Sequence, residues 1–245
     1  MERIISYPLS GLYILLFGLT LVVFHPIQWL CLNLFGYDAH RKSVALLNLC
    51  LMRCTHLLGT RYTFKNTVLL PAKGPAIIVA NHQSMYDIPP IIWRLRRFHP
   101  KFVSKKELGR GIPSVSYNLR HGGSALIDRK DRKQSLTAIR ELGEYIERTG
   151  RSAVIFPEGT RSRDGNPKAF RMVGLKVLIK SAPSAHIIPV SINNSWKILR
   201  FGKFPYGLGA HLEFIIHPSV PAAGCTDKEL DEIEVTIASA INKSP

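Results

Sequence analysis

The sequence predicts an α/β protein with a mostly parallel central sheet flanked by helices and an N-terminal membrane-associating helical segment. From residue 61 onward, short β-branched runs alternate with longer amphipathic stretches, and polar residues follow abruptly where several of these runs end. The region before residue 61 contains the most apolar part of the chain. We therefore expect membrane-associating helices over residues 1–60 and an α/β domain over residues 61–245.

The N-terminal segment has the composition of helices that enter a lipid bilayer. Leu9–Phe24 is nearly free of charge, His25-Pro26 interrupts it, and Ile27–Phe35 is apolar again. Because proline kinks or ends a helix, we expect a hairpin with its break at Pro26 that dips into one leaflet. A single clean span and a buried helix pair of a soluble protein are the alternatives.

The expected strands are brief, rich in β-branched residues, and bounded by glycine, proline or polar residues. They cover Tyr62–Lys65, Ala76–Ala80 (after a loop over Leu70–Pro75), the residues near Phe102, Ser124–Ile127, Ala153–Phe156, His186–Ile192 and Leu212–Ile216.

Helices are expected before, between and after these strands, and two of the helices end at the glycines Gly59 and Gly150. A capping box of Thr226 and Glu229 opens the last helix, which carries a stripe of apolar residues. The others cover Ala39–Leu58, Ile88–Arg97, Gly111–Arg120, Asp131–Arg148 and Val173–Lys180.

The charge of the chain indicates an acidic partner. The formal net charge is +16, and residues 93–180 hold 21 Lys and Arg against 8 Asp and Glu. Nucleic acid, an anionic membrane surface and phosphorylated substrates would all suit such a surface. A nucleic-acid binder is expected to interleave aromatic with basic residues, whereas here the aromatics lie mainly in apolar strands and the N-terminal helices.

His82 and Asp87 form a candidate catalytic pair. They follow the strand Ala76–Ala80, and the carboxyl ends of parallel strands are where ligand sites collect. A turn leading into a helix can join the two side chains. The carboxylate then holds one ring nitrogen as N–H and leaves the other free to take a proton. The alternative is an ordinary loop histidine beside a helix-capping aspartate.

Three further strand ends carry charged residues. In the loop Phe156–Ser162, Gly159 permits close backbone approach to a ligand, and Arg161 offers a planar fork of donors suited to phosphate. A structural turn with a solvated arginine is the alternative. Arg129 and Lys105 follow two other strands, and either residue alone would be read as a solvated surface charge. Because these strand ends share one edge of a parallel sheet, they predict a basic cleft beside the His/Asp pair.

Four blocks carry a family resemblance: Asn81–Asp87, Gly123–Arg129, Phe156–Ser162 and Ile188–Val190. Their order and spacing resemble the motifs of the glycerolipid acyltransferase family, particularly its bacterial 1-acylglycerol-3-phosphate O-acyltransferases. The motif region covers residues 76–192, about half of the chain, and the N-terminal apolar segment also resembles the family's membrane helices. One departure is Leu126, where many members carry phenylalanine, and it bears on packing rather than chemistry.

The resemblance implies acyl transfer from acyl-CoA or acyl-carrier protein to the free hydroxyl of lysophosphatidate, giving phosphatidate. His82 would be the base, and Asp87 would fix its tautomer. Lys105 and Arg161 would bind the acceptor phosphate, with Arg129 as a further contributor. The site loop would consist of Glu158, Gly159 and Thr160. No cofactor or metal is expected.

The expected location is the cytoplasmic face of the inner membrane, with an anionic lipid surface as partner and no nucleic acid. Two alternatives stay open at this point. One keeps the chemistry but changes the acceptor to another lysophospholipid, a lyso-aminolipid or glycerol 3-phosphate. The other is a non-catalytic basic module that binds membranes or nucleic acid.

Overall fold

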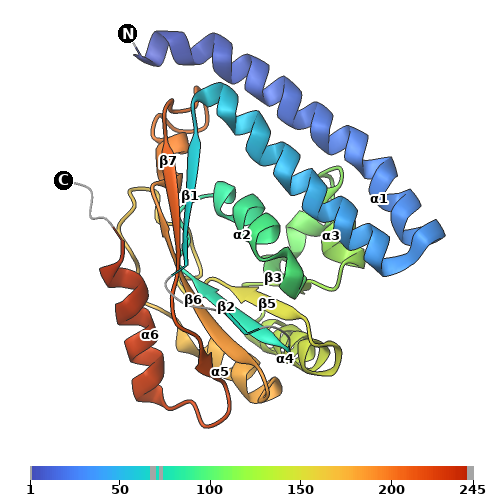
Figure 1. The fold of residues 1–245 in the computed structure, drawn as a ribbon, viewed down its shortest axis with the longest axis vertical. Helices are drawn as coiled ribbons and strands as arrows, with labels where there is room; N and C mark the ends of the chain where they lie inside the picture. The colour runs from blue at the N-terminus through green and yellow to red at the C-terminus, as the bar shows by residue number, and fades with distance from the viewer. Residues whose placement is uncertain (1, 67–69, 72–73, 242–245) are drawn as a thin grey trace.

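A central sheet of eight strands, with helices on both faces, forms the body of the protein (Figure 1). The structure is a computed structural model that describes residues 2–66, 70–71 and 74–241. The strand order is β1-β7-β6-β2-β5-β3-β4, and β8 pairs with β6. The strands are β1 Arg61–Asn66, β2 Ala76–Ala80, β3 Pro100–Lys105, β4 Ala125–Ile127, β5 Ser152–Ile155, β6 His186–Asn193, β7 His211–Ile216 and β8 Val220–Pro221.

The predicted fold class is confirmed. The neighbours β6-β2-β5-β3-β4 are all parallel, whereas β7 and β8 run antiparallel to β6. Every expected strand is present, with ends that differ by a few residues from the expected ones. The short strand β8 was not expected. Of the loop expected over Leu70–Pro75, residues 72–73 lie outside the described part of the chain.

The helices match the expected order with shifted ends. α2 ends at Arg94 rather than Arg97, because residues Arg96–Phe98 form a 3-10 helix instead. α3 begins only after Pro113. The bounds are α1 Glu2–Thr55, α2 Ile88–Arg94, α3 Val115–His121, α4 Arg132–Thr149, α5 Met172–Ser181 and α6 Asp227–Ser239. Thr226 and Glu229 form the predicted capping box of α6.

The central strand β2 explains why the molecule has two cores. All five of its residues are buried, and successive side chains point to opposite faces. Ala76, Ile78 and Ala80 belong to a core shared with α1 and α2. Ile77 and Val79 belong to a second core under α4, α5 and α6. Both faces of the sheet are therefore sealed, and its carboxyl edge is left for a site.

The helix break expected at Pro26 is wrong. α1 runs through Pro26 and turns back at Gly36, where φ is 76° and ψ is −170°, a conformation that favours glycine. The result is a hairpin of two long arms lying across one side of the molecule (Figure 1).

Packing between the arms keeps the first one helical around Pro26. Four apolar side chains, two from each arm, bury against one another: Leu21, Phe24, Leu47 and Leu51. His25 Nδ1 also accepts a hydrogen bond from the backbone N–H of Ser114, at 3.1 Å. These tertiary contacts oppose the destabilisation that proline causes inside a helix, about 3 kcal/mol.

Candidate active site

The turn after β2 is fixed by an amide that continues the sheet. Asn81 Nδ2 donates to the carbonyl of Ile192 at 2.9 Å, and Asn81 Oδ1 accepts from the N–H of Ile192 at 2.7 Å. The side chain thus replaces the next rung of the β2–β6 ladder and lets the backbone leave the sheet. His82 follows at the carboxyl edge of the strands, as predicted.

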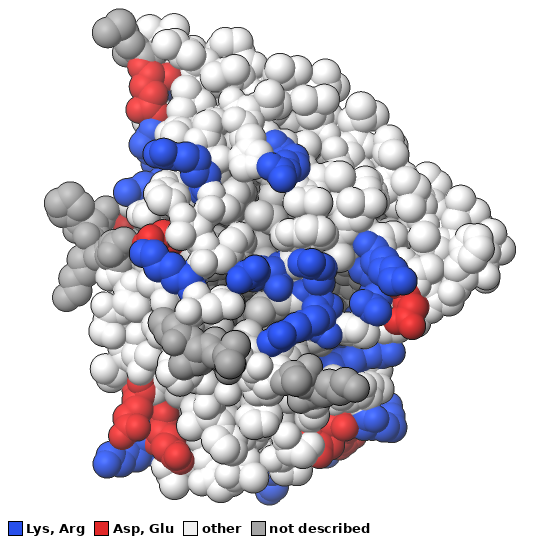
Figure 2. Space-filling model, viewed as in Figure 1, with Lys and Arg blue, Asp and Glu red and all other residues white. Residues whose placement is uncertain are grey.

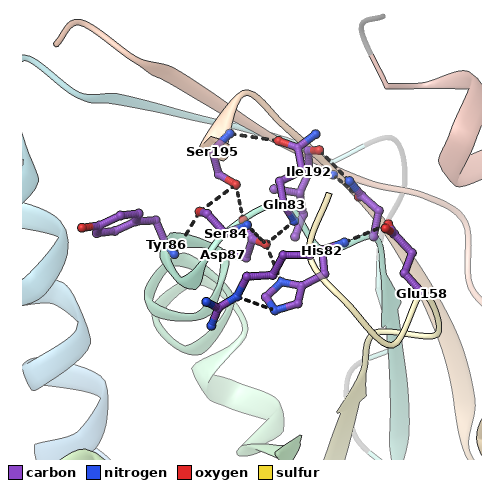
Figure 3. Close-up of polar contacts among 10 residues, drawn as sticks. His82, Gln83, Ser84, Tyr86, Asp87, Glu158, Ile192 and Ser195 are labelled. Atoms are coloured by element: carbon purple, nitrogen blue, oxygen red, sulfur yellow. Dashed lines mark hydrogen bonds and ion pairs between the residues drawn. The ribbon is translucent and has the colours of Figure 1, made fainter. Parts of the chain in front are cut away.

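Asp87 both pairs with His82 and caps a helical turn (Figure 3). His82 Nδ1 lies 2.7 Å from Asp87 Oδ2, and the same oxygen accepts from the backbone N–H groups of Gln83 and Ser84 at 2.8 and 3.0 Å. Asp87 and Ser84 form a capping box, so the capping alternative considered from the sequence is also correct. One carboxylate can both cap the turn and hold His82, because its oxygens accept several hydrogen bonds at once.

These contacts define the tautomer of His82. An ionised carboxylate can only accept hydrogen bonds, so Nδ1 of His82 must carry the proton. Nε2 of the neutral ring is then an acceptor, and it receives a hydrogen bond from Arg161 Nε at 3.3 Å. The His82 side chain is 12% exposed, whereas Asp87 is fully buried. The basic nitrogen therefore points toward Arg161.

Ser195 supports the aspartate and was missed by the sequence reasoning. Its hydroxyl donates to Asp87 Oδ1, its backbone N–H donates to Gln83 Oε1 at 3.0 Å, and Ser84 Oγ donates to Ser195 Oγ at 3.0 Å (Figure 3). All four residues are buried. Ser195 lies two residues beyond β6, so the rule of polar residues after parallel strands marks it as a candidate but does not identify Asp87 as its partner.

Ser84 is therefore placed for structure rather than as a nucleophile. Its side chain accepts from the N–H of Tyr86 at 3.1 Å while its hydroxyl proton goes to Ser195. Ser84 is completely buried. A buried hydroxyl that already donates its proton to Ser195 is unsuited to form an acyl-serine intermediate.

The loop after β5 holds His82 from the other side. Phe156 stacks on the imidazole, with ring centroids 4.1 Å apart. Glu158 Oε1 accepts from the N–H of His82 at 3.0 Å, and Ser162 N–H donates to the His82 carbonyl at 2.7 Å. Both backbone groups of His82 are thereby fixed by a segment more than 70 residues away.

Glu158 acts on the backbone of His82 and not on its ring. Burial raises the pKa of Glu158 to about 7, and the hydrogen bond from the His82 N–H opposes that rise. Gly159, at φ 70°, turns the chain immediately afterwards. Thr160 is exposed, and its hydroxyl accepts from Lys168 Nζ at 3.1 Å. The three predicted site-loop residues thus order the loop around Arg161.

The basic residues expected at the phosphate site are only partly brought together. Burial lowers the pKa of Arg129, and the nearby charges of Arg161 and Arg171 lower it further. Arg171 was not predicted, and its guanidinium lies against Gly159. Lys105 ends β3 abreast of Ile127 and is exposed. Within the described residues, no hydrogen bond or ion pair joins Lys105 to this group.

An aromatic contact links the site to the N-terminal hairpin. Tyr13 of α1 donates its hydroxyl proton to Tyr86 Oη at 3.0 Å, and Tyr206 stacks edge-on against Tyr13 with centroids 5.0 Å apart. Tyr13 and Tyr86 are 1% and 2% exposed. The turn that carries His82 and Asp87 is therefore anchored directly on the first arm of the hairpin.

Comparison with known proteins identifies the family. The family model described as Acyltransferase matches residues 61–193, which is more than half of the chain. The chain belongs to the acyltransferase family. This confirms the resemblance read from the four motif blocks, and it makes the protein a glycerolipid O-acyltransferase, as predicted.

Individual relatives in the acyltransferase family agree. The chain is 35% identical over 130 residues to a 1-acyl-sn-glycerol-3-phosphate acyltransferase of Helicobacter pylori, covering 50% of this chain and 52% of that protein. It is 27% identical over 204 residues to the enzyme of the same name from Borreliella burgdorferi, covering 83% and 79%. The match with the first relative thus spans about half of that relative's length.

The fold is also found in a solved member of the acyltransferase family. The crystal structure of the 1-acyl-sn-glycerophosphate acyltransferase of Thermotoga maritima superposes with a TM-score of 0.80 at 24% identity, covering 98% of this chain and 95% of that one. α1 is long and apolar enough to cross a membrane by length and composition. Helix and family together indicate a membrane-associated protein.

Proposed function

We propose that this enzyme transfers an acyl chain from acyl-CoA or acyl-carrier protein to the free hydroxyl of 1-acylglycerol 3-phosphate, giving phosphatidate. The observation that supports this most directly is the acceptor nitrogen Nε2 of His82, which Asp87 orients and which lies beside a group of arginines. A base beside cations suits a hydroxyl substrate that also carries phosphate.

The reaction needs one proton acceptor and one nucleophile. The acceptor hydroxyl gives its proton to His82 Nε2 as its oxygen attacks the thioester carbonyl. Asp87 stabilises the imidazolium that forms. When the tetrahedral intermediate collapses, the C–S bond breaks and the thiolate leaves with the proton from His82. This sequence uses no resident cofactor or metal.

Arg161 would bind the acceptor phosphate and, in doing so, leave His82. In the structure its Nε–H donates a hydrogen bond to His82 Nε2, the nitrogen that must accept the proton. Phosphate is the stronger acceptor because it is charged, and a guanidinium can bind it in bidentate fashion. Arg129 and Lys105 lie at the ends of neighbouring strands and would supply further positive charge.

The decisive experiment offers the purified full chain several acceptors with both acyl donors. We expect phosphatidate from lysophosphatidate, measured by mass spectrometry together with thiol release. Other lysophospholipids, a lyso-aminolipid and glycerol 3-phosphate test the acceptor. A product from one of these alone would correct the acceptor. The protein could instead be folded, release no thiol with any combination of acceptor and donor, and bind generic DNA. That result would favour a non-catalytic nucleic-acid-binding module.

We propose further that the hairpin lies in the cytoplasmic face of the inner membrane. The outer side of α1 exposes large apolar side chains, among them Ile4 at 74%, Leu15 at 65% and Phe35 at 73%. Such a surface requires lipid or a substitute. It extends along the first arm to the turn, as expected of an arm lying within one leaflet.

The hairpin predicts the same side of the membrane for Arg3 and Arg41. Cysteines introduced singly at these positions should both react with an impermeant thiol reagent only when the cytoplasmic face is open. A cysteine placed at Arg163 on the α/β domain serves as the cytoplasmic control. Labelling of the two positions from opposite sides would indicate a membrane-spanning helix and contradict the hairpin arrangement.

A further inference from the structure

The turn of the hairpin covers a second group of cations, at the end of the sheet opposite to His82. Tyr37, directly after Gly36, packs against the amino ends of β3 and β5. Arg151 Cζ lies 3.6 Å from the centroid of the Tyr37 ring, and Lys101 Nζ lies 4.8 Å from it. Three distant segments therefore place two cations on one aromatic ring.

The positive charge of this group is not balanced by the protein. His99 contacts Tyr37, and the charge of Arg41 acts on both Tyr37 and Lys101. Among the described residues, the carboxylate that acts on the group is Asp38, which is bound to Arg41 at 2.6 Å. Lys101 is only 6% exposed, and within the described part of the chain its ammonium has no hydrogen bond or ion pair. A buried ammonium beside a guanidinium is unfavourable unless an anion joins them.

The pKa of Lys101 reflects the same imbalance. Burial first, and then the charges of Arg151 and Arg41, lower this pKa from its usual range to about 7. An anion bound between Lys101 and Arg151 would reverse both effects, because it replaces lost hydration and neutralises the repulsion.

We propose that Tyr37, Lys101 and Arg151 form an anion site that binds the phosphate of an anionic phospholipid headgroup in the bilayer surface. The lipid source follows from the position of the site at the hairpin turn, where Leu34 and Phe35 are 64% and 73% exposed. This rests on the membrane association proposed above. Figure 2 shows Lys and Arg gathered across the face beneath the hairpin, whose outer side is largely free of them.

This site is separate from the acceptor phosphate site. Arg151 precedes β5, whereas Phe156, which stacks on His82, follows it. The five steps between them along an extended strand span about 16 Å. The two residues mark opposite edges of a sealed sheet, so one substrate phosphate cannot contact both.

The test measures binding of the full chain to vesicles of phosphatidylcholine alone and of phosphatidylcholine mixed with phosphatidylglycerol. Lys101→Met and Arg151→Gln should each reduce binding to the anionic vesicles about 5-fold and leave binding to neutral vesicles unchanged. Lys180→Met, an exposed lysine on α5, is the matched control and should keep the preference. Unchanged preference in both site variants would overturn the proposal.

The pH dependence gives a readout that a purely structural lysine would not show. Wild-type preference for anionic vesicles should be stronger at pH 6 than at pH 8, because Lys101 gains its proton across this range. His40 and His99 also face the group, but their pKa values are lowered to about 4, mainly by burial, so both stay neutral. Burial raises the pKa of Tyr37, and the pKa of Asp38 is lowered, so neither titrates there.

The conservative variant Lys101→Arg keeps the proposal testable if Lys101→Met fails to fold. It should keep the preference for anionic vesicles and lose its dependence on pH, whereas Lys101→Met should lose both. Failure of the wild type to bind either kind of vesicle would contradict the membrane association, and the lipid assignment would fall with it. If inorganic phosphate raises the melting temperature of wild type but not of Lys101→Met, while vesicle preference is equal in both, the site takes a soluble anion and the lipid assignment is wrong.

Discussion

Replacing His82 with alanine is expected to lower the rate of acyl transfer about 10²- to 10⁴-fold while leaving the fold and membrane binding intact. The side chain acts on the proton of the acceptor hydroxyl, whereas the turn is held by other groups. Asp87 still accepts from Gln83 and Ser84, and Glu158 still accepts from the backbone N–H at position 82. Thiol release under saturating substrates measures the effect.

The matched control is His186→Ala, at the amino end of the neighbouring strand β6 and so at the opposite edge of the sheet. It should retain activity close to wild type. A melting curve and vesicle binding establish that both variants are folded. Turnover of His82→Ala within a few-fold of wild type, in folded protein, would rule out His82 as the general base.

Replacing Arg161 with alanine is expected to raise the acceptor KM about 10- to 150-fold, the loss of one charge-assisted contact of roughly 1.5 to 3 kcal/mol. If that contact is equally strong in the ground and transition states, kcat is spared. The donor KM should barely change, because Arg161 is expected to contact the acceptor phosphate and not the thioester. Steady-state kinetics with each substrate varied in turn separates these quantities.

Three variants sharpen this test. Arg161→Lys should restore binding only in part, because a point charge cannot reproduce the bidentate fork. Lys105→Ala should raise the acceptor KM in the same way if its side chain turns toward the phosphate. Arg163→Ala, exposed in the same loop, is the control and should change neither KM.

A structural role for Arg161 predicts a different pattern. Its loss would then lower the melting temperature and damage the use of both substrates to a similar degree. An unchanged acceptor KM in both Arg161→Ala and Lys105→Ala would contradict the assignment of the phosphate site.

Patterns that depend on neighbouring residues were predictable from the sequence. The apolar run Ala76–Ala80 had to be buried, and its abrupt end at Asn81 located the carboxyl edge of the sheet. The five-residue spacing of His82 and Asp87 fitted a capped turn, which the structure contains. These features follow from burial and local hydrogen bonding, which act over a few residues.

Contacts between distant segments could not be obtained in this way. Pro26 is a reliable helix breaker by local rules, yet packing between the two arms keeps it inside α1 and moves the turn to Gly36. Ser195 reaches Asp87 across 108 residues, so no spacing rule connects the two. Lys105 was expected beside Arg161 because both end neighbouring strands, but strand ends do not determine where a long, exposed side chain points.

The sequence by itself determined the α/β class, the order of nearly every strand and helix, and the residue types gathered at the catalytic edge, because hydrophobic period and capping are local properties of the chain. Only the tertiary structure decided which hydrogen bonds hold His82 and where the hairpin turns. It also brought Lys101 and Arg151 onto the ring of Tyr37. The physical reason is that these contacts join segments far apart in the chain, and their geometry is fixed only when the two cores pack on either side of β2.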